Sequence, residues 1–174
     1  MKTLTILMLL IGSTLWLKAQ INKMPTEALV TLDGVTVMSN TILGTTSPTI
    51  LIFWKSGNNK CCDNLESLQS AWLTDLQQQG VKMVAICTDC NGSWSNIKPM
   101  AYGRNWEFDI YIDPNGNFKR AMSISDVPTT MLFDQHQQLL CRQSGYCSGD
   151  EELICEKINK HIEDLILFTK TIND

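Results

Sequence analysis

The chain alternates between short apolar runs and segments in which apolar residues recur every three or four positions. Two runs, Thr49 to Trp54 and Val81 to Cys87, are apolar almost throughout, which is typical of strands buried on both faces. Between them, leucines and a tryptophan recur at helical spacing from Leu65 to Leu76, and Gly80 ends the pattern. This stretch therefore predicts a strand, a helix and a second strand.

The remaining apolar and polar positions follow the same two periods. The elements that they predict are a hairpin over Leu29 to Val37, a helix over Gly92 to Asn105, a strand over Phe108 to Ile112, a short helix over Phe118 to Met122, a hairpin of Thr130 to Phe133 with Gln138 to Arg142, and an amphipathic helix over Asp150 to Phe168. The order βαβαβ followed by ββα predicts an α/β fold with a mixed central β-sheet and helices on both faces.

The start of the chain has the pattern of an export signal. Lys2 is followed by an apolar run from Leu4 to Leu17 and then by Ala19-Gln20, which is the arrangement of a secretory signal peptide. The run is short for a membrane span, which needs about 20 apolar residues, and an uncleaved membrane anchor is the alternative. We expect a signal peptide at 1–19 and a single domain at 20–174, located outside the cytoplasm and, in a Gram-negative cell, in the periplasm.

Composition and charge narrow the range of functions. The chain has 174 residues, of which 44% are hydrophobic, enough for one well-formed core. Removal of residues 1–19 leaves 12 basic residues against 18 acidic ones, a net charge of −6. Nucleic-acid binding needs clustered Lys and Arg, so this acidic chain argues against it. No glycine-rich phosphate loop is present, and we expect no cofactor and no membrane contact beyond the signal peptide.

Cysteines are the most informative residues of the expected mature chain. The seven are Cys61, Cys62, Cys87, Cys90, Cys141, Cys147 and Cys155. An exported protein can keep disulfides, and an odd number leaves at least one thiol free or paired outside the chain. Cys141 and Cys147 flank a turn, and we expect a bridge there that joins a strand to the last helix. Cys155 falls close to the apolar stripe of that helix, where we expect a buried free thiol.

Four segments, in order along the chain, have the character of a thioredoxin-type scaffold. They are Thr49 to Trp54, Val81 to Ile86, Ile112 to Gly116, and Val127-Pro128-Thr129-Thr130 leading to Asp134. Over about residues 24 to 166 the chain resembles the thioredoxin-like family, and within it the exported TlpA/ResA type of thiol–disulfide oxidoreductase. The resemblance implies a thioredoxin-like fold and a cis Pro128 opposite the active cysteine. It also implies thiol–disulfide exchange with protein substrates and with a redox partner protein.

The family's Trp-Cys-x-x-Cys motif is altered in this chain. In the register that the resemblance implies, the motif falls on Gly57 to Cys61, so Asn58 occupies the position of the attacking cysteine. A register shifted by one residue places Asn59 first and Cys62 second. In a third alternative a longer loop makes Cys61 itself the nucleophile at a helix start, where the helix N-terminus lowers the pKa of a thiol.

A partner thiol for the altered motif can come from the next strand. Cys87 ends the second buried strand and forms its own Cys-x-x-Cys with Cys90. We expect Cys61 or Cys62 to exchange with Cys87 or Cys90. The alternatives are a local Cys87–Cys90 bridge or buried cysteines without a role. A bridge between the adjacent Cys61 and Cys62 is unfavourable, because their Cα atoms lie about 3.8 Å apart and disulfides prefer roughly 4.4–6.8 Å.

The sequence therefore predicts an exported thiol–disulfide oxidoreductase with Cys61, Cys62 and Pro128 at its centre. The main alternative is a non-catalytic thioredoxin-like binding protein, which the missing cysteine favours. A less favoured alternative is metal binding or copper delivery by the clustered thiols. The family often keeps an acidic residue beneath its active site, and Glu66 and Glu107 are the candidates, although neither matches a motif.

Overall fold

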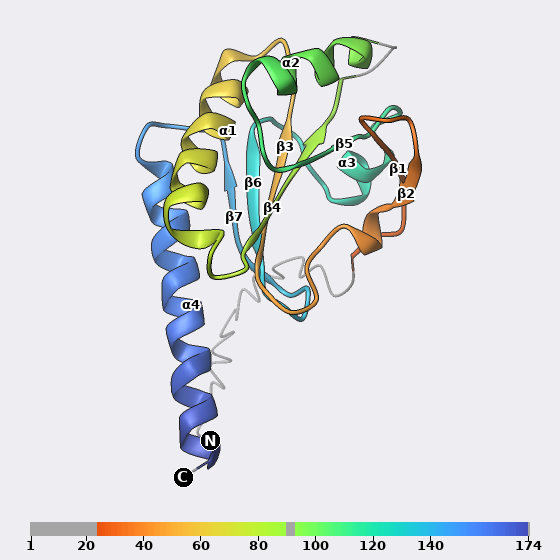
Figure 1. The fold of residues 1–174 in the computed structure, drawn as a ribbon. Coiled ribbons are helices and arrows are strands. Elements are labelled where there is room, and N and C mark those ends of the chain that lie inside the picture. The colour runs from red at the N-terminus through yellow and green to blue at the C-terminus, as the bar shows by residue number, and fades with distance from the viewer. Residues whose placement is uncertain (1–23, 90–92, 174) are drawn as a thin grey trace, which may run out of the picture.

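A seven-stranded mixed sheet forms the middle of the protein, in the order β2-β1-β5-β4-β3-β6-β7 (Figure 1). The computed structural model describes residues 24–89 and 93–173, so the predictions for the signal peptide at 1–19 and for Cys90 lie outside the described residues. The strands are β1 Ala28–Thr31, β2 Thr36–Met38, β3 Thr49–Trp54, β4 Lys82–Cys87, β5 Asp109–Ile112, β6 Thr129–Phe133 and β7 Leu139–Ser144. The predicted α/β fold with a mixed central sheet is confirmed.

Helices cover both faces of this sheet. They are α1 Asn59–Ala71, α2 Ile97–Gly103, α3 Asn117–Ala121 and α4 Asp150–Asn173, with short helical turns at Ser39–Thr41, Trp72–Leu76 and Ser93–Asn96. Buried residues of α1, α2 and α4 pack in one core cluster, and Phe118 of α3 packs in a second cluster on the other face. Helix α4 extends well beyond the sheet (Figure 1), five residues further than the sequence predicted.

The alternation of side chains along β3 explains why its sequence is apolar throughout. Ile50, Ile52 and Trp54 belong to the cluster beneath α1 and α4, whereas Leu51 and Phe53 belong to the cluster beneath α3. All six residues of β3 are buried. A central strand that is covered on both faces has no polar side, so the pattern in the sequence is a continuous run.

The strand register brings the ends of β3 and β4 and the start of β6 to one rim of the sheet. β3 and β4 are parallel, with Trp54 opposite Cys87, and the backbone N–H of Thr88 donates to the Trp54 carbonyl at 2.9 Å. β6 runs antiparallel to β3 with Thr129 opposite Phe53, so the start of β6 lies at the same rim. The Val127–Pro128 bond just before β6 is cis, as predicted. The rim thus contains the start of α1, the end of β4 and the cis proline.

The segment after α1 is a π-helical turn over Trp72–Leu76 that leads back to β4. The Trp72 indole N–H donates to the Val81 carbonyl at 2.6 Å, which fixes the entrance to the strand. No helix within residues 24–89 and 93–173 is both long enough and apolar enough to cross a membrane.

Candidate functional site

Asn58 is the residue that caps α1 at the rim. Its backbone is extended, and its side-chain Oδ1 accepts a hydrogen bond from the Cys61 backbone N–H at 3.4 Å. Asparagine is among the preferred N-caps, because its oxygen satisfies a backbone donor that the first helical turn leaves unpaired. The Asn58 Nδ2 donates to the Val127 carbonyl at 3.4 Å. One amide therefore joins the helix start to the residue that precedes the cis proline.

Both cysteines of the first turn of α1 are buried. Cys61 is fully buried among core residues, and burial raises the pKa of its thiol to about 11. Cys62 is 3% exposed, and its Sγ lies 4.0 Å from the Ser56 carbonyl oxygen. Burial also raises the pKa of Cys62, while the positive charge of Arg104 acts in the opposite direction. Burial is therefore the largest influence on the pKa of both thiols.

Cys87, which the sequence analysis offers as a candidate partner thiol, is buried at the end of β4. It is fully buried and belongs to the same core cluster as Cys61 and Trp54. Burial raises the pKa of the Cys87 thiol above its ordinary range, and the electrostatic influence of Cys61 acts in the same direction. The structure therefore brings Cys61 and Cys87 into one buried cluster, with Cys62 next to Cys61 on the helix.

Two loops of the rim are joined by a carboxylate. Asp89 follows β4, and its Oδ2 accepts hydrogen bonds from both the backbone N–H and the hydroxyl of Ser56. Ser56 lies in the loop between β3 and α1, so the loop that precedes the cysteines is tied to the loop that follows Cys87. This link fixes the relative position of the two cysteine-bearing segments.

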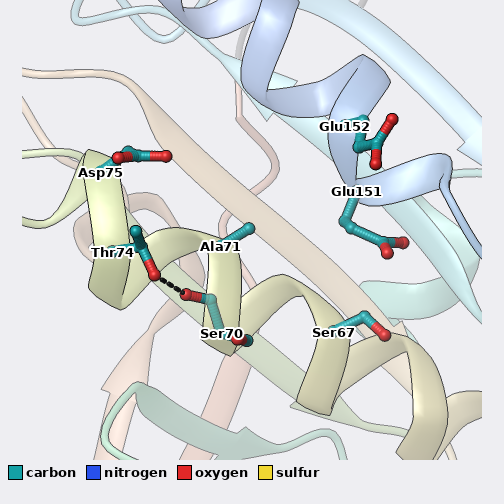
Figure 2. A pocket seen from close by; sticks show the side chains of 7 residues that line it. All are labelled: Ser67, Ser70, Ala71, Thr74, Asp75, Glu151 and Glu152. Carbon is teal, nitrogen blue, oxygen red and sulfur yellow. Dashed lines mark hydrogen bonds between the residues drawn. The ribbon is translucent and has the colours of Figure 1, made fainter.

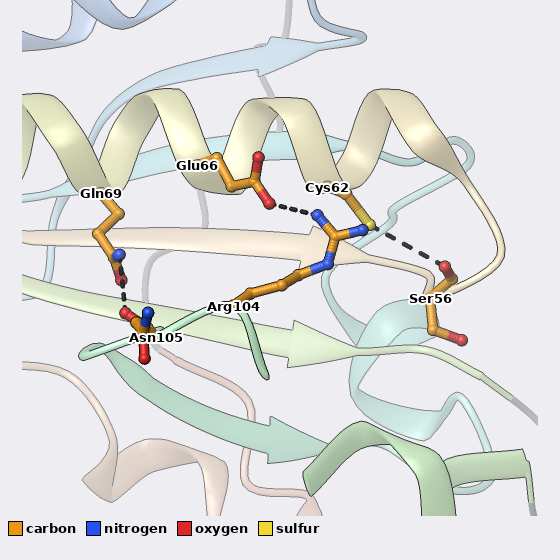
Figure 3. Close-up of polar contacts among 6 residues, drawn as sticks. All are labelled: Ser56, Cys62, Glu66, Gln69, Arg104 and Asn105. Atoms are coloured by element: carbon orange, nitrogen blue, oxygen red, sulfur yellow. Dashed lines mark hydrogen bonds and ion pairs between the residues drawn. The ribbon is translucent and has the colours of Figure 1, made fainter. Parts of the chain in front are cut away.

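Beside Cys62, the segment after α2 lies against α1 (Figure 3). The Arg104 guanidinium forms an ion pair with Glu66 and lies 5.9 Å from the centre of the Trp106 ring. Gln69 donates from Nε2 to the Asn105 carbonyl at 3.1 Å. Glu66 is thus a partly exposed partner of an arginine rather than an acid beneath the thiols.

The polar residue of α1 that faces the sheet is Asn64, which the sequence analysis missed. It is 3% exposed, and its Nδ2 donates to the Thr130 hydroxyl at 3.2 Å. Glu107 is exposed, so neither acidic candidate occupies this position. Helical spacing gave a signal for Asn64, because it lies at i+3 from Cys61 on the stripe that continues to Leu65 and Leu68.

The predicted Cys141–Cys147 bridge is wrong, because both cysteines are free. Cys141 lies on β7 opposite Leu132 and packs against the core cluster beneath α1 and α4. Cys147 is exposed in the loop before α4, where its backbone N–H donates to Asp150 at 2.7 Å. The two side chains therefore belong to different environments. Cys155 is free, as predicted, and half-buried rather than fully buried.

A hollow between α4 and the helical stretch of α1 and Trp72–Leu76 shares no lining residue with Cys61, Cys62 or Cys87 (Figure 2). Its lining is polar and acidic and consists of Ser67, Ser70, Ala71, Thr74, Asp75, Glu151 and Glu152. Within residues 24–89 and 93–173 no group of three or more His, Cys, Asp or Glu side chains is arranged to hold a metal ion. The metal alternative thus gains no support from the described thiols.

Comparison with known proteins agrees with this geometry. The sequence matches the AhpC/TSA family over residues 21–140, and the chain belongs to this family. The fold is thioredoxin-like, as the sequence predicted. No curated protein sequence matches the chain.

Solved structures resemble the chain over most of its length. A thioredoxin-like protein from Porphyromonas gingivalis has 27% identity and a TM-score of 0.71, covering 81% of this chain and 92% of its own. A thiol:disulfide interchange protein DsbE from Chlorobium tepidum has 23% identity and a TM-score of 0.69, covering 79% and 94%. A secreted disulfide oxidoreductase from Mycobacterium tuberculosis has 14% identity and a TM-score of 0.61, covering 78% and 96%. The last two likenesses establish the fold alone.

Proposed function

We propose that this protein is an exported thiol–disulfide oxidoreductase of the TlpA/ResA type with a rearranged cysteine centre. The centre consists of Cys61 and Cys62 on α1 and Cys87 on β4, with Cys90 as a further partner and Pro128 beside it. Its substrates are protein thiols and disulfides, and a redox partner protein returns it to its starting state. Two solved structures of the same fold support this proposal: the one from Chlorobium tepidum is described as a thiol:disulfide interchange protein and the one from Mycobacterium tuberculosis as a disulfide oxidoreductase.

The observation that carries the proposal is that Cys61 and Cys87 belong to the same buried core cluster, and that Cys61 influences the pKa of the Cys87 thiol. A disulfide needs Cα atoms roughly 4.4–6.8 Å apart, which adjacent residues cannot provide. Residues from two different elements that pack in one cluster can provide it. The missing thiol at Asn58 is thereby replaced from another element of the fold.

Thiol–disulfide exchange at this centre proceeds by successive displacements at sulfur. The thiolate of Cys61 or Cys62 attacks a substrate disulfide, so the substrate S–S bond breaks, a mixed disulfide forms, and one substrate sulfur leaves as a thiolate. Cys87 then attacks that helix sulfur, which releases the second substrate thiol and leaves a disulfide between Cys87 and the helix cysteine that attacked. Where Cys62 attacks first, Cys61 then attacks the Cys87 sulfur and displaces Cys62, which leaves the Cys61–Cys87 disulfide. The protein loses two electrons and two protons, and the substrate gains them. Run in reverse, the same steps oxidise a substrate.

The second candidate is a non-catalytic binding protein, and the burial of the thiols favours it. A thiol with a pKa of about 11 is ionised in only about one molecule in ten thousand at neutral pH. In addition, the Asn58 amide occupies both the helix cap and the Val127 carbonyl. In this candidate the rim contacts a partner without exchanging electrons.

Thiol labelling across a series of redox buffers, together with a disulfide reductase assay, separates the two candidates. The variants are Cys61→Ser, Cys62→Ser and Cys87→Ser, with Cys155→Ser as the control for a half-buried thiol on α4. In the oxidoreductase, loss of Cys61 should raise the labelling of Cys87 in oxidising buffer and abolish activity, while Cys155→Ser changes neither. Independent labelling of Cys61, Cys62, Cys87 and Cys90, with no activity in the parent, would support the binding protein.

Export is the second part of the proposal. It rests on the signal-peptide pattern of residues 1–19, and it agrees with the description of the Mycobacterium tuberculosis structure as secreted. Cleavage after Ala19 would leave Gln20 as the first residue of a single domain over 20–174. N-terminal sequencing of protein recovered from the periplasm tests this. Met1 retained on protein in the membrane fraction would instead indicate an anchor.

A further inference from the structure

One face of α1 carries Cys62 and lies against the segment that follows α2. Cys62, Glu66 and Gln69 lie at i, i+4 and i+7, so their side chains share one face of the helix. This face is turned toward the segment that follows α2, as Figure 3 shows. Cys61, one residue earlier, faces the core instead. The two adjacent cysteines are therefore in different surroundings.

Gln69 holds this segment with both ends of its amide. Its Nε2 donates to the Asn105 carbonyl at 3.1 Å, and its Oε1 accepts from the Glu107 backbone N–H at 2.8 Å. Asn105 has a φ of 52°, in the left-handed region that most residues avoid. The turn after α2 is therefore fixed against α1 by specific contacts rather than by loop length.

Arg104 is placed over Cys62 by the same turn. Its guanidinium donates to the Glu66 carboxylate, and the Trp106 ring lies beneath it. In Figure 3 the guanidinium lies between the Glu66 carboxylate and the Cys62 sulfur. The Arg104 side chain is 40% exposed and the whole Cys62 residue 3% exposed. The arginine therefore brings a positive charge near the thiol.

We propose that Arg104 is a positioning residue that makes Cys62 the attacking thiol of the centre, with Glu66 holding the guanidinium in place. This rests on the proposed function, and it decides which of the two helix cysteines meets the substrate first. The Cys62 thiolate attacks the substrate disulfide and releases one substrate thiolate. Cys87 next displaces the second substrate thiolate from Cys62, and Cys61 then displaces Cys62, which leaves the Cys61–Cys87 disulfide.

Other charged groups around Cys62 act against its thiolate. The groups that influence it are Cys61, Asp63 and Glu66 from α1, Asp89 from the loop after β4, and Arg104 from the turn after α2. Three of these are carboxylates, and Arg104 is the cation. Among the charges, Arg104 has the largest influence on the pKa of Cys62 and lowers it. Removal of this charge should therefore leave Cys62 surrounded only by groups that disfavour its ionised form.

The test is the pH dependence of Cys62 alkylation by iodoacetamide, followed by peptide fragmentation that distinguishes Cys62 from Cys61. Arg104→Gln should raise the midpoint of the rate profile by about half to one pH unit, which is about a three- to tenfold slower reaction below the midpoint. Arg104→Lys keeps the charge and should shift the midpoint less. Glu66→Gln keeps a side-chain oxygen that can accept from the guanidinium but removes an opposing negative charge, so it should lower the midpoint. High salt should reduce these differences, because the Arg104–Glu66 pair is partly exposed.

Lys82→Gln is the matched control. Lys82 forms a partly exposed ion pair with Asp109 at 2.9 Å, at the start of β4 and therefore at the opposite end of that strand from Cys87. It changes the net charge of the protein by the same amount as Arg104→Gln and should leave the Cys62 midpoint unchanged. A midpoint in Arg104→Gln equal to that of the control overturns the inference. An alkylation rate in Arg104→Gln that rises by the same factor at every pH also overturns the inference, because the arginine then acts only by limiting the access of the reagent to Cys62.

The same variants separate this inference from the proposed function. Disulfide exchange is measured in parallel with alkylation. If Arg104 governs the Cys62 midpoint and the parent exchanges no disulfides, the proposed function is wrong, and the coupling of Arg104 to Cys62 stands. If the parent is active and Arg104→Gln changes neither midpoint nor turnover, the inference is wrong and the function stands.

Discussion

Replacing Asn58 with cysteine should create a reversible Cys-x-x-Cys pair with Cys61. The Asn58 carbonyl accepts from the Cys61 backbone N–H at 3.0 Å, so the two residues span one tight turn. The Cα atoms across such a turn lie less than about 7 Å apart, which overlaps the range for disulfides. The side chain at position 58 already points toward the first turn of α1, because its Oδ1 contacts the Cys61 backbone.

The Asn58→Cys substitution should change stability in two opposing ways. Loss of the Asn58 cap should cost about 1 kcal/mol in the reduced variant. A disulfide that closes a four-residue loop removes about 6 cal/mol/K of chain entropy, or about 2 kcal/mol at 25 °C. The oxidised Asn58→Cys protein should therefore be about 2 kcal/mol more stable than its reduced form and about 1 kcal/mol more stable than the parent.

Chemical denaturation of oxidised and reduced samples measures this difference, and mass spectrometry identifies the bridged residues. The new thiol lies at the helix N-cap, where backbone N–H groups stabilise a thiolate, so it should also react faster than Cys61 with alkylating reagents. Disulfide reductase activity should increase over that of the parent. Asn59→Cys is the matched control, because it places a cysteine three residues before Cys62 in the shifted register.

The outcome distinguishes the two registers. A bridge between positions 58 and 61, with no bridge in Asn59→Cys, agrees with Asn58 at the attacking position. A bridge between positions 59 and 62 would favour the shifted register. If neither variant forms a bridge in an oxidised glutathione buffer, the superposition of this segment on a Cys-x-x-Cys motif is wrong.

Three further predictions concern the buried groups near the rim. Burial raises the folded-state pKa of Cys61 to about 11. The contribution of the protonated Cys61 thiol to stability is therefore complete below about pH 9 and is lost as the pH rises. The difference in unfolding free energy between the parent and Cys61→Ala should shrink by up to about 3 kcal/mol between pH 9 and 11. Trp72→Phe leaves the Val81 carbonyl without its 2.6 Å donor and should lower the unfolding free energy by about 1–3 kcal/mol in urea titrations. Asn64→Ala and Thr130→Val should each destabilise by about 1 kcal/mol, and the double variant by less than their sum, since they share one hydrogen bond.

The sheet could be predicted from sequence because its central strands carry an unambiguous pattern. The apolar runs of β3 and β4 match their observed bounds within one residue, since strands covered on both faces contain no polar alternation to confuse them. The cis bond before Pro128, which the resemblance to the thioredoxin-like family implied, is confirmed. The end of α4 was placed too early, because the helix continues beyond the sheet where no core imposes a stripe.

The candidate site was predicted only in part, because its contacts join elements distant in sequence. Spacing suggested a bridge between Cys141 and Cys147, yet spacing does not say that Cys141 points into the core while Cys147 lies in an exposed loop. Likewise, nothing local to Cys62 indicates Arg104, which reaches it from a turn 42 positions later in the chain. Such pairs depend on how α1 and α2 meet, and helical periodicity does not encode this.

The position of Asn58 explains how an amide side chain holds this rim together. Its amide satisfies a backbone donor of α1 and also the Val127 carbonyl, which are two of the polar groups that the rim must pair. Capping the helix requires only a side-chain oxygen. Thiol–disulfide exchange would require a thiol from another residue. Stability and reactivity at this rim therefore depend on different residues. Because they do, variants of Cys62, Cys87 and Arg104 can lose reactivity while the helix start and the cis Pro128 turn remain intact, which makes the assays of exchange interpretable.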